Sequence, residues 1–159
     1  MSDVKYLKLI GKNQGLISAG CSTLDSIGNR YQESHKDQIQ VLDVDYNISR
    51  MQNSVHHPIL FTKPIDKSSP LLGVAVSKNE LLDAEFSFYR ISQSGKLERY
   101  FEIKLTKATI VDFNQSFPEK NNRSNIVSHE KILLNYESIS WNHITAGTSG
   151  YSISHQNTL

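Results

Sequence analysis

The chain is 159 residues long and has a mass of 18.0 kDa, the size of one average domain. Its 17 Lys and Arg residues against 16 Asp and Glu residues give a formal net charge of +1. That balance lacks the basic excess of proteins that bind nucleic acid through phosphates or hold a membrane surface through basic clusters. We therefore expect one domain over residues 1–159, with no nucleic-acid partner and no membrane insertion. A near-neutral chain also permits self-association.

The residue types favour strands over helices. The chain has 5 Ala residues against 15 Ile, 8 Val, 7 Tyr and 6 Phe, and β-branched and aromatic side chains favour strands. The single cysteine, Cys21, excludes an intrachain disulfide and a multi-thiolate metal site. Asp3, Lys5 and Lys8 interrupt the first apolar residues, so this stretch does not resemble a signal peptide. No apolar run approaches the roughly 18 residues of a membrane-spanning helix.

Alternating apolar and polar residues predict the strands of the first half. Residues 4–10 are predicted to form a strand, and residues 12–37 a long loop with at most short strand pieces. Residues 39–49 are predicted to form a strand whose dry face holds Leu42, Val44, Tyr46 and Ile48. The wet face of that strand holds Asp43, Asp45, Asn47 and Ser49. After a polar connection at 50–57, a third strand places Ile59, Phe61 and Ile65 on one face. Pro58 and Pro64 indicate strand ends or an exposed edge.

The second half predicts one helix, a hairpin and a last strand. Ser69 is the expected cap and Pro70 the first residue of a short apolar helix that closes one end of the core. A hairpin with its turn at 92–96 aligns Ala84, Phe86 and Phe88 with Phe101, Ile103 and Leu105. Phe101, Ile103 and Leu105 are expected to face the core. Leu42, Val44 and Tyr46 are expected to face it with them.

A polar loop is expected at 112–128, including Asn121 and Asn122, and a last strand at 132–141. The apolar phase of that strand changes between Tyr136 and Ile139, which predicts a bulge. From Gly147 to Leu159 the sequence is polar and a mobile tail is expected. Six or seven strands with one short helix predict a mainly β domain, either a barrel or a sandwich.

Candidate catalytic and metal-binding residues are isolated in this sequence. Cys21 and His35 could pair as nucleophile and base, but nothing near Cys21 would lower its pKa, so a small buried or half-buried residue is expected. His56 and His57 are adjacent and point to opposite faces of an extended segment, which favours a solvated pair over a metal site. The remaining histidines are scattered, at 35, 129, 143 and 155. Asp43 and Asp45 share one strand face, whereas glycosidase chemistry needs opposing walls. We expect no enzyme, metal or cofactor.

The segment Pro64-Ile65-Asp66-Lys67-Ser68-Ser69-Pro70, followed by Leu71 and Leu72, resembles the signature of the Hcp family (hemolysin-coregulated protein), the tube proteins of bacterial type VI secretion. Agreement extends in order through residues 4–152. The other matching stretches are 11–12, 15–18, 21–23, 26–29, 35–39, 136–139 and 145–147. The connection at 50–57 is shorter than the glycine-rich loop of some family members.

The resemblance implies a β-barrel subunit that forms homo-hexameric rings. The rings stack into a tube inside a contractile sheath, with a spike protein at its tip and a baseplate below. It implies assembly in the cytoplasm and release through the machine without a signal peptide. Family members hold effector proteins in the ring lumen, and some carry a toxin domain, which is not expected here because the chain ends soon after the last matching stretch.

Two classes of function remain open at this level: a tube subunit, or a monomeric β-sandwich module that binds a small ligand or glycan. The resemblance also favours the lumen wall for the strand that carries Asp43, Asp45 and Asn47. Carboxylates suit a surface that stays wet when the ring is empty.

Overall fold

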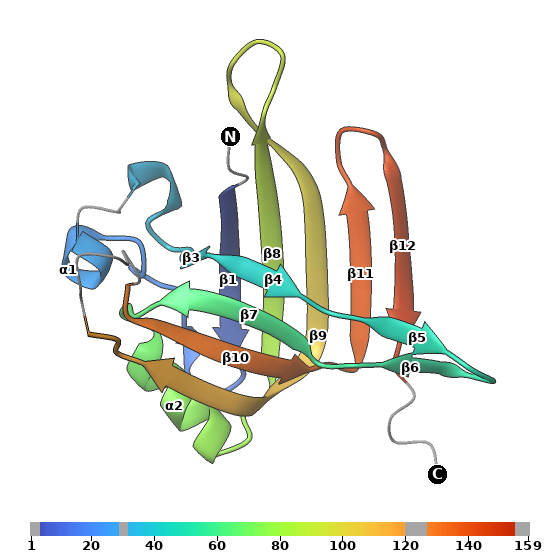
Figure 1. Ribbon diagram of the computed structural model, residues 1–159, viewed down its shortest axis with the longest axis horizontal. Coiled ribbons are helices and arrows are strands. Elements are labelled where there is room, and N and C mark those ends of the chain that lie inside the picture. Colours follow the sequence, from blue (N-terminus) through green and yellow to red (C-terminus); the bar gives the residue numbers. More distant parts are fainter. Residues whose placement is uncertain (1–3, 29–31, 120–126, 155–159) are drawn as a thin grey trace.

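The computed structural model describes residues 4–28, 32–119 and 127–154, and within them the chain is mainly β. A ten-stranded sheet forms the body, and a two-stranded sheet projects from it (Figure 1). More strands form than the six or seven predicted. They are β1 (Val4–Gly11), β2 (Gly15–Leu16), β3 (Ile39–Val41), β4 (Asp43–Asp45), β5 (Ile48–Arg50), β6 (Ser54–His56), β7 (Ile59–Pro64), β8 (Leu82–Ile91), β9 (Leu97–Ser116), β10 (His129–Asn135), β11 (Ser138–His143) and β12 (Thr148–Ile153).

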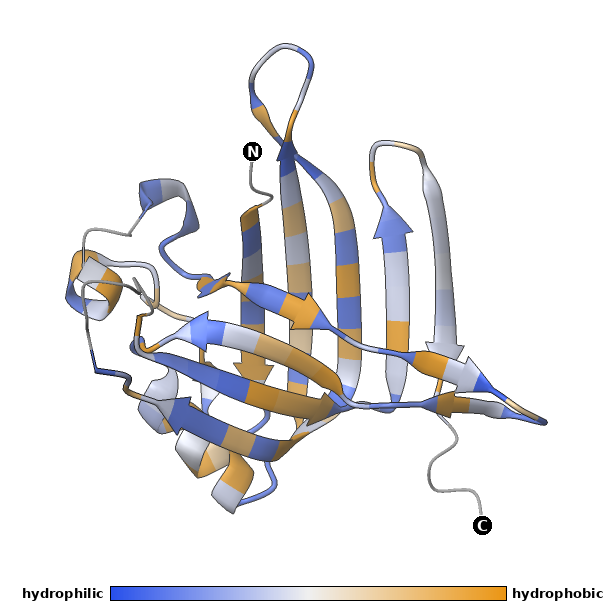
Figure 2. Cartoon of the chain, in the orientation of Figure 1, coloured by the Kyte–Doolittle hydropathy of each residue, from blue (hydrophilic) through white to orange (hydrophobic). Residues whose placement is uncertain are grey.

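The predicted hairpin of β8 and β9 is confirmed and forms the centre of the sheet. Ser92 N donates to Lys96 O at 2.8 Å, and Gly95 adopts the positive φ of 82° that the turn requires. β1 pairs with β8 along its whole length. Figure 2 shows hydrophobic and hydrophilic residues alternating along these strands, as expected when one face of a sheet lies in the core.

β9 is long enough to belong to two layers of the molecule. Its first part pairs with β8 and β11, and its second part pairs with β10. Between the two parts Lys107 has a φ of 48°, and the buried positions change from Ile103 and Leu105 to Ala108 and Ile110. The sheet therefore turns over here. A front layer of β4, β7, β10 and the second part of β9 crosses a back layer of β1, β8, the first part of β9, β11 and β12 (Figure 1).

The phase change predicted between Tyr136 and Ile139 is present, but a corner in the chain causes it rather than the predicted bulge. β10 ends at Asn135 and β11 begins at Ser138, and the two strands pair with successive parts of β9. Glu137 N donates to the backbone oxygen of Thr106, which lies opposite Ser138 in β9, at 3.1 Å. The chain therefore follows β9 from the front layer into the back layer.

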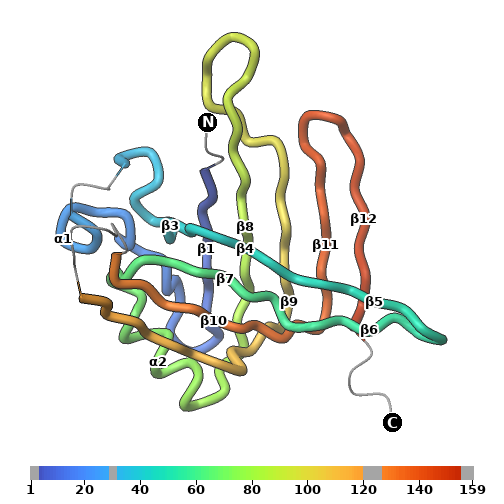
Figure 3. Tube along the Cα trace, in the orientation of Figure 1, coloured from blue at the N-terminus to red at the C-terminus, as the bar shows by residue number. Residues whose placement is uncertain are grey.

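Residues 39–49, predicted as one strand, belong to three. β3 pairs with β1 in the back layer, β4 pairs with β7 in the front layer, and β5 belongs to the projecting hairpin. The change of layer occurs at Leu42, whose side chain is 38% exposed, so its predicted place on the dry face is wrong. β3 and β4 lie at opposite ends of the strand order and are consecutive in the chain (Figure 3). The sheet therefore wraps almost completely around its core.

The hydrophobic core lies between the two layers. Phe61 from the front layer and Phe86 from the back layer are fully buried, and their rings meet edge to face with centroids 5.5 Å apart. Part of the predicted core set is confirmed. Its buried members are Ile103 and Leu105, and its partly buried members are Val44, Tyr46 and Phe101.

The predicted helix is confirmed as α2 (Ser69–Ser77), which brings Leu72 and Ala75 to one end of the core (Figure 1). The predicted cap is wrong. Ser69 is the first helical residue, and its Oγ accepts a hydrogen bond from Asp66 N at 3.0 Å. The region 12–37 contains β2, as expected for short strand pieces, and also α1 (Leu24–Ile27) and the 3-10 turn η2 (Glu33–His35). Within the described ranges, every helix is too short or too polar to span a bilayer.

Two polar segments near the C-terminal end are strands rather than the predicted loop and tail. β9 continues to Ser116 within the expected loop at 112–128, because β10 completes its hydrogen-bonded ladder. Asn121 and Asn122 lie outside the described residues. β12 pairs with β11 along its length, so residues 148–153 form a strand; the mobility expected of the tail stays a prediction, and residues 155–159 lie outside the described part of the chain.

Candidate functional surfaces

The outward side of the front layer carries acidic side chains around an apolar pair. Asp43 and Asp45 are exposed on β4, while Val44 between them packs against the core, as their alternation predicts. Residues paired across neighbouring strands point to the same face, so this surface continues across β7, β10 and β9. We call it the acidic face. Its members are Asp43, Asp45, Leu60, Thr62, Asp112, Asn114, Lys131 and Leu133.

The acidic face has a formal charge of −2, because three exposed aspartates accompany one exposed lysine, Lys131. Leu60 lies opposite Leu133, and both are half-buried. A surface with excess carboxylates attracts basic groups, and its apolar centre can contact an apolar side chain of a partner. All of its members project from one side of one layer, which is not the opposing-wall geometry of paired catalytic carboxylates.

The sequence prediction found part of this face. Asn47, the third predicted member, lies beyond β4, where its backbone oxygen accepts a hydrogen bond from His57 N at 3.1 Å. Asp112 and Lys131 are additional members that no sequence pattern singled out. Asp112 falls in the segment predicted as a loop, although its alternation with Phe113 and Asn114 is a usable strand signal.

The segment Pro64–Pro70 is folded around a buried ion cluster. Lys63 Nζ lies 2.6 Å from Glu130 Oε2 and 2.9 Å from Asp66 Oδ1, and it donates to Pro64 O at 3.0 Å. The side chains of all three charged residues are fully buried. The cluster therefore keeps one positive and two negative charges away from water, an arrangement in which each charge depends on its partners.

Hydrogen bonds within the chain fix the rest of this segment. Asp66 Oδ1 accepts from both the backbone N and the Oγ of Ser68, and Lys67 N donates to Ser26 Oγ at 2.8 Å. Of its seven residues, Pro64, Asp66, Ser68 and Ser69 are buried, Ile65 is half-buried, and Lys67 and Pro70 are exposed. The segment therefore fixes the entry to α2 and presents little surface of its own.

Lys63 and Glu130 were not among the predicted site residues, although strand periodicity points to both. Lys63 is two positions after the buried Phe61, and Glu130 is two positions before the buried Ile132. A charged residue in the buried phase of a strand indicates a buried ion pair. The predicted inward residue Ile65 lies after the end of β7, which is a central strand between β4 and β10. Pro64 therefore marks a strand end and not a sheet edge.

Cys21 is a buried residue with an unreactive thiol. Burial raises its pKa to about 12, and the carboxylate of Asp66 adds to this rise, with partial offsets from Lys63 and Ser68. His35 is held elsewhere. Its ring stacks on Tyr6 with centroids 3.9 Å apart. The structure thus confirms the expected small buried cysteine, and the surroundings of the thiol do not activate it as a nucleophile.

His56 and His57 point to opposite sides, as predicted, but they are not a solvated pair. His56 is only 2% exposed; its Nδ1 lies 2.7 Å from the Tyr136 hydroxyl and its Nε2 3.0 Å from Ser152 Oγ. His57 is exposed, with its Nε2 3.1 Å from Ser49 Oγ. The prediction of two wet histidines is therefore wrong for His56.

The other histidines make separate local contacts. His129 Nδ1 lies 2.9 Å from Val127 O, and His143 Nδ1 accepts from Ala146 N at 3.1 Å. His155 lies outside the described residues. Among the residues that the structure describes, no three His, Cys, Asp or Glu side chains gather in a geometry that could hold a metal ion.

Glu80 ties the end of α2 to the turn that follows β1. Its Oε2 accepts from the backbone N of Asn13 at 3.0 Å and of Gln14 at 2.9 Å, and its Oε1 accepts from Gln14 Nε2 at 2.9 Å. Desolvation raises the pKa of Glu80, but these hydrogen bonds and Lys78 outweigh it, so the net shift is downward. A Cβ at Gly11 would clash with Glu80 Oε2, so the carboxylate could stay in these hydrogen bonds only if the residue at position 11 has no side chain.

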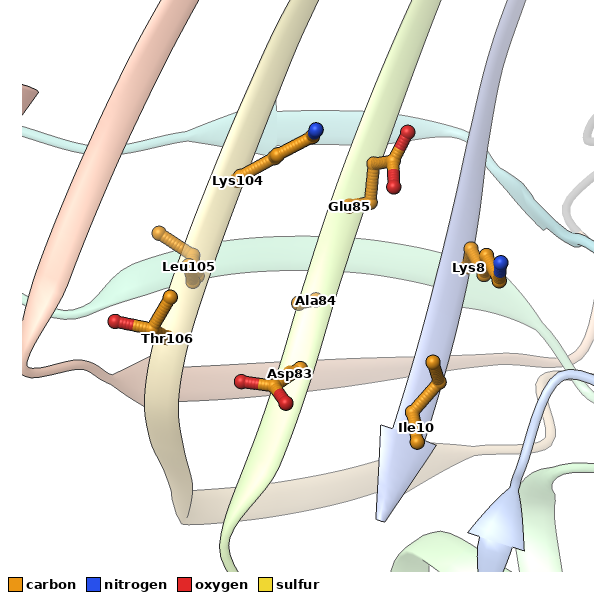
Figure 4. A pocket seen from close by; sticks show the side chains of 8 residues that line it. All are labelled: Lys8, Ile10, Asp83, Ala84, Glu85, Lys104, Leu105 and Thr106. Atoms are coloured by element: carbon orange, nitrogen blue, oxygen red, sulfur yellow. The ribbon is translucent and has the colours of Figure 1, made fainter.

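The outward side of the back layer has a shallow depression of about 250 Å³ (Figure 4). Lys8, Glu85 and Lys104 lie opposite one another across β1, β8 and β9, so positive and negative side chains alternate there. Glu85 forms an ion pair with Arg99 at 3.0 Å. Alternating charges on a partly exposed sheet are typical of a solvated face and select no particular ligand.

Comparison with known proteins places these features in a family context. Residues 6–143 match the family model described as "Type VI secretion system effector, Hcp". The major exported protein of Pseudomonas aeruginosa is 38% identical over 162 residues, covering 94% of each chain. The uncharacterized protein YhhZ of Escherichia coli K12 is 40% identical over 149 residues, which are 93% of this chain and 37% of that protein. This chain thus spans well under half of that longer relative.

Solved structures show the same fold. A crystal structure of an Hcp protein superposes with a TM-score of 0.94 at 33% identity, covering 98% of this chain and 100% of that one. The secreted protein Hcp3 from Pseudomonas aeruginosa superposes with a TM-score of 0.89 at 35% identity and the same coverage.

Proposed function

Because this chain belongs to the Hcp family of type VI secretion, whose members are structural rather than enzymatic, we propose that it is a subunit of the inner tube of that machine. Copies form hexameric rings, and the rings stack into a tube. The match of residues 6–143 to the family carries this proposal. The nearly neutral chain supports it, because stacked copies repel one another little.

The ring places the acidic face on its lumen wall. Asp43 and Asp45 lie at the exposed edge strand of the front layer and keep their carboxylates in water, which suits a channel that is sometimes empty. Repetition around a ring multiplies the excess negative charge of each subunit. The wall therefore favours effector proteins with basic surfaces, and Leu60 and Leu133 give such a partner an apolar contact.

The partners are those of the secretion machine. Other copies of the chain contact the subunit within and between rings, the sheath surrounds the tube, and spike and baseplate proteins contact its ends. The tube assembles in the cytoplasm and leaves the cell through the machine, in line with the exported relative. A single domain over residues 1–159 is sufficient for this role.

The mass of the purified protein in solution tests the proposal. Light scattering is expected to show a species near six times 18.0 kDa, and electron microscopy is expected to show rings of uniform diameter. A monomer at all concentrations would contradict the tube and favour the alternative of a monomeric β-sandwich binding module.

A charge reversal tests the lumen assignment separately. Asp43→Lys with Asp45→Lys is expected to leave hexamers intact and to reduce retention of basic effectors. The control is Asp25→Lys with Asp83→Lys, which changes the net charge equally at exposed positions outside the acidic face. If the first pair dissociates the ring while the control does not, Asp43 and Asp45 lie at a subunit interface and the lumen assignment fails.

A further inference from the structure

We propose that His56 is a positioning residue that fixes the direction of the β5–β6 hairpin, and that self-assembly depends on this fixed direction. The second half of this inference rests on the proposed tube. The first half concerns the single chain and can be tested even if no ring forms.

The hairpin has its own ladder, separate from the main sheet. β5 pairs with β6 through Ile48–His56, Ser49–Val55 and Arg50–Ser54, and together they form a two-stranded sheet. Figure 3 shows it as the far end of the run from β3 to β6, where the chain turns back beyond β12 in this view. An isolated two-stranded hairpin is marginally stable in water. Its direction must therefore be set by contacts between its base and the body.

Side chains at both strands of the base supply such contacts. On the side that enters the hairpin, the Tyr46 hydroxyl accepts a hydrogen bond from Trp141 Nε1 of β11 at 2.7 Å. On the side that leaves it, the His56 ring lies between the Tyr136 hydroxyl and Ser152 Oγ of β12. His56 thus connects the hairpin to the corner between β10 and β11 and to the last strand of the sheet.

The chemistry of this contact suits a fixed imidazole. A neutral imidazole has one donor nitrogen and one acceptor nitrogen, and the two hydroxyls can rotate to match either arrangement. Burial is the main cause that raises the pKa of Tyr136 to about 12, so its hydroxyl stays protonated at neutral pH. The rings of His56 and Tyr136 also meet edge to face with centroids 5.4 Å apart. No other common side chain offers two nitrogens at this spacing on a rigid ring.

If the base of the hairpin is no longer held, the turn of the hairpin moves most. Met51 is 93% exposed there and Val55 is 46% exposed, whereas His56 at the base is buried. A rotation about the base therefore displaces the apolar Met51 far more than it displaces the core. A neighbouring copy that meets the hairpin in one direction would lose that contact without any change in the sheet.

The test compares the same substitution at two neighbouring histidines. His56→Phe keeps an aromatic ring and removes both buried nitrogen contacts. His57→Phe, the matched control, makes the same change at the exposed neighbour, where it removes only a solvent-exposed contact with Ser49 Oγ. Hydrogen exchange is measured for amides of residues 48–56, with β8 amides as the internal reference, and light scattering gives the assembly state. For His56→Phe we expect about tenfold faster exchange in the hairpin, unchanged β8 amides and loss of rings, because both nitrogen contacts at the base of the hairpin are lost. His57→Phe is expected to match the wild type.

Unchanged hairpin exchange in His56→Phe would overturn the positioning role, and faster exchange with intact rings would overturn its link to assembly. If His56→Phe does not fold, Ser152→Ala removes one of the two contacts and is held to the same two criteria. If the wild type never assembles, the tube proposal fails, and the exchange measurement still decides whether His56 positions the hairpin.

Discussion

Replacement of Lys63 by methionine tests whether the buried ion cluster holds the Pro64–Pro70 segment in place. Methionine fills much of the same volume without the charge, so the change leaves the carboxylates of Glu130 and Asp66 buried without their shared cation. Removal of one partner from a buried ion pair destabilises a protein by about 3–5 kcal/mol. We expect Lys63→Met to lower the free energy of unfolding by this amount. Lys67→Met, at an exposed lysine of the same segment, is expected to stay within about 0.5 kcal/mol of the wild type.

Urea unfolding followed by the fluorescence of the single tryptophan, Trp141, measures both variants. Protein concentration is held constant, because assembly would add to the apparent stability. A double-mutant cycle then separates charge from packing: Glu130→Gln is expected to cost much less in the Lys63→Met background than in the wild type. If Lys63→Met loses less than about 1 kcal/mol, or if the two changes add independently, the cluster does not act as a unit and the reasoning is refuted.

Three further variants test separate features by the same unfolding assay. Gly11→Ala is expected to lower the free energy of unfolding by about 1–3 kcal/mol, because the new Cβ meets Glu80. Gly73→Ala, in α2, has no atom within 4 Å of the new Cβ and is expected to raise it by up to about 1 kcal/mol. Equal effects of the two changes would contradict the close approach of Gly11 to Glu80. Glu80 has a lowered pKa in the folded state, so its contribution is full above the unfolded value of 4.5 and is lost as pH falls through the folded value. Glu80→Gln is therefore expected to differ most from the wild type at pH 7 and least in acid, and a pH-independent difference would contradict this. Phe86→Ala, at a fully buried site, is expected to lower the free energy of unfolding by about 3–5 kcal/mol. Phe101→Ala, at a partly buried site, is expected to lower it clearly less, and the reverse order would contradict the assigned core.

Local patterns in the sequence predict the elements that form locally. The β8–β9 hairpin follows from alternation on both sides of a short glycine-containing turn, and α2 follows from a serine and a proline before an apolar run. Asp43 and Asp45 could be placed on one face for the same reason, since side chains two positions apart in a strand point to the same side.

The sequence predictions were wrong or incomplete where the structure depends on partners distant in the sequence. Leu42 is exposed because the chain changes layers there, and β12 forms because β11 offers a free edge, although its own side chains are mostly polar and exposed. Asp112 joins the acidic face only through the register of β9 with β10. None of these pairings is encoded by the period of a single strand.

In the front layer, the residues that stabilise the fold are separate from the residues that form its outer surface. Along β7 and β10 the inward positions hold Phe61, Lys63, Glu130 and Ile132, whereas the outward positions between them form the acidic face. Substitution of an exposed residue usually changes stability by less than about 0.5 kcal/mol, whereas loss of a buried charge or ring costs several times more. The outward residues can therefore change while the buried cluster and the crossing of the layers stay intact, and in the proposed tube such changes would alter which effectors the lumen favours.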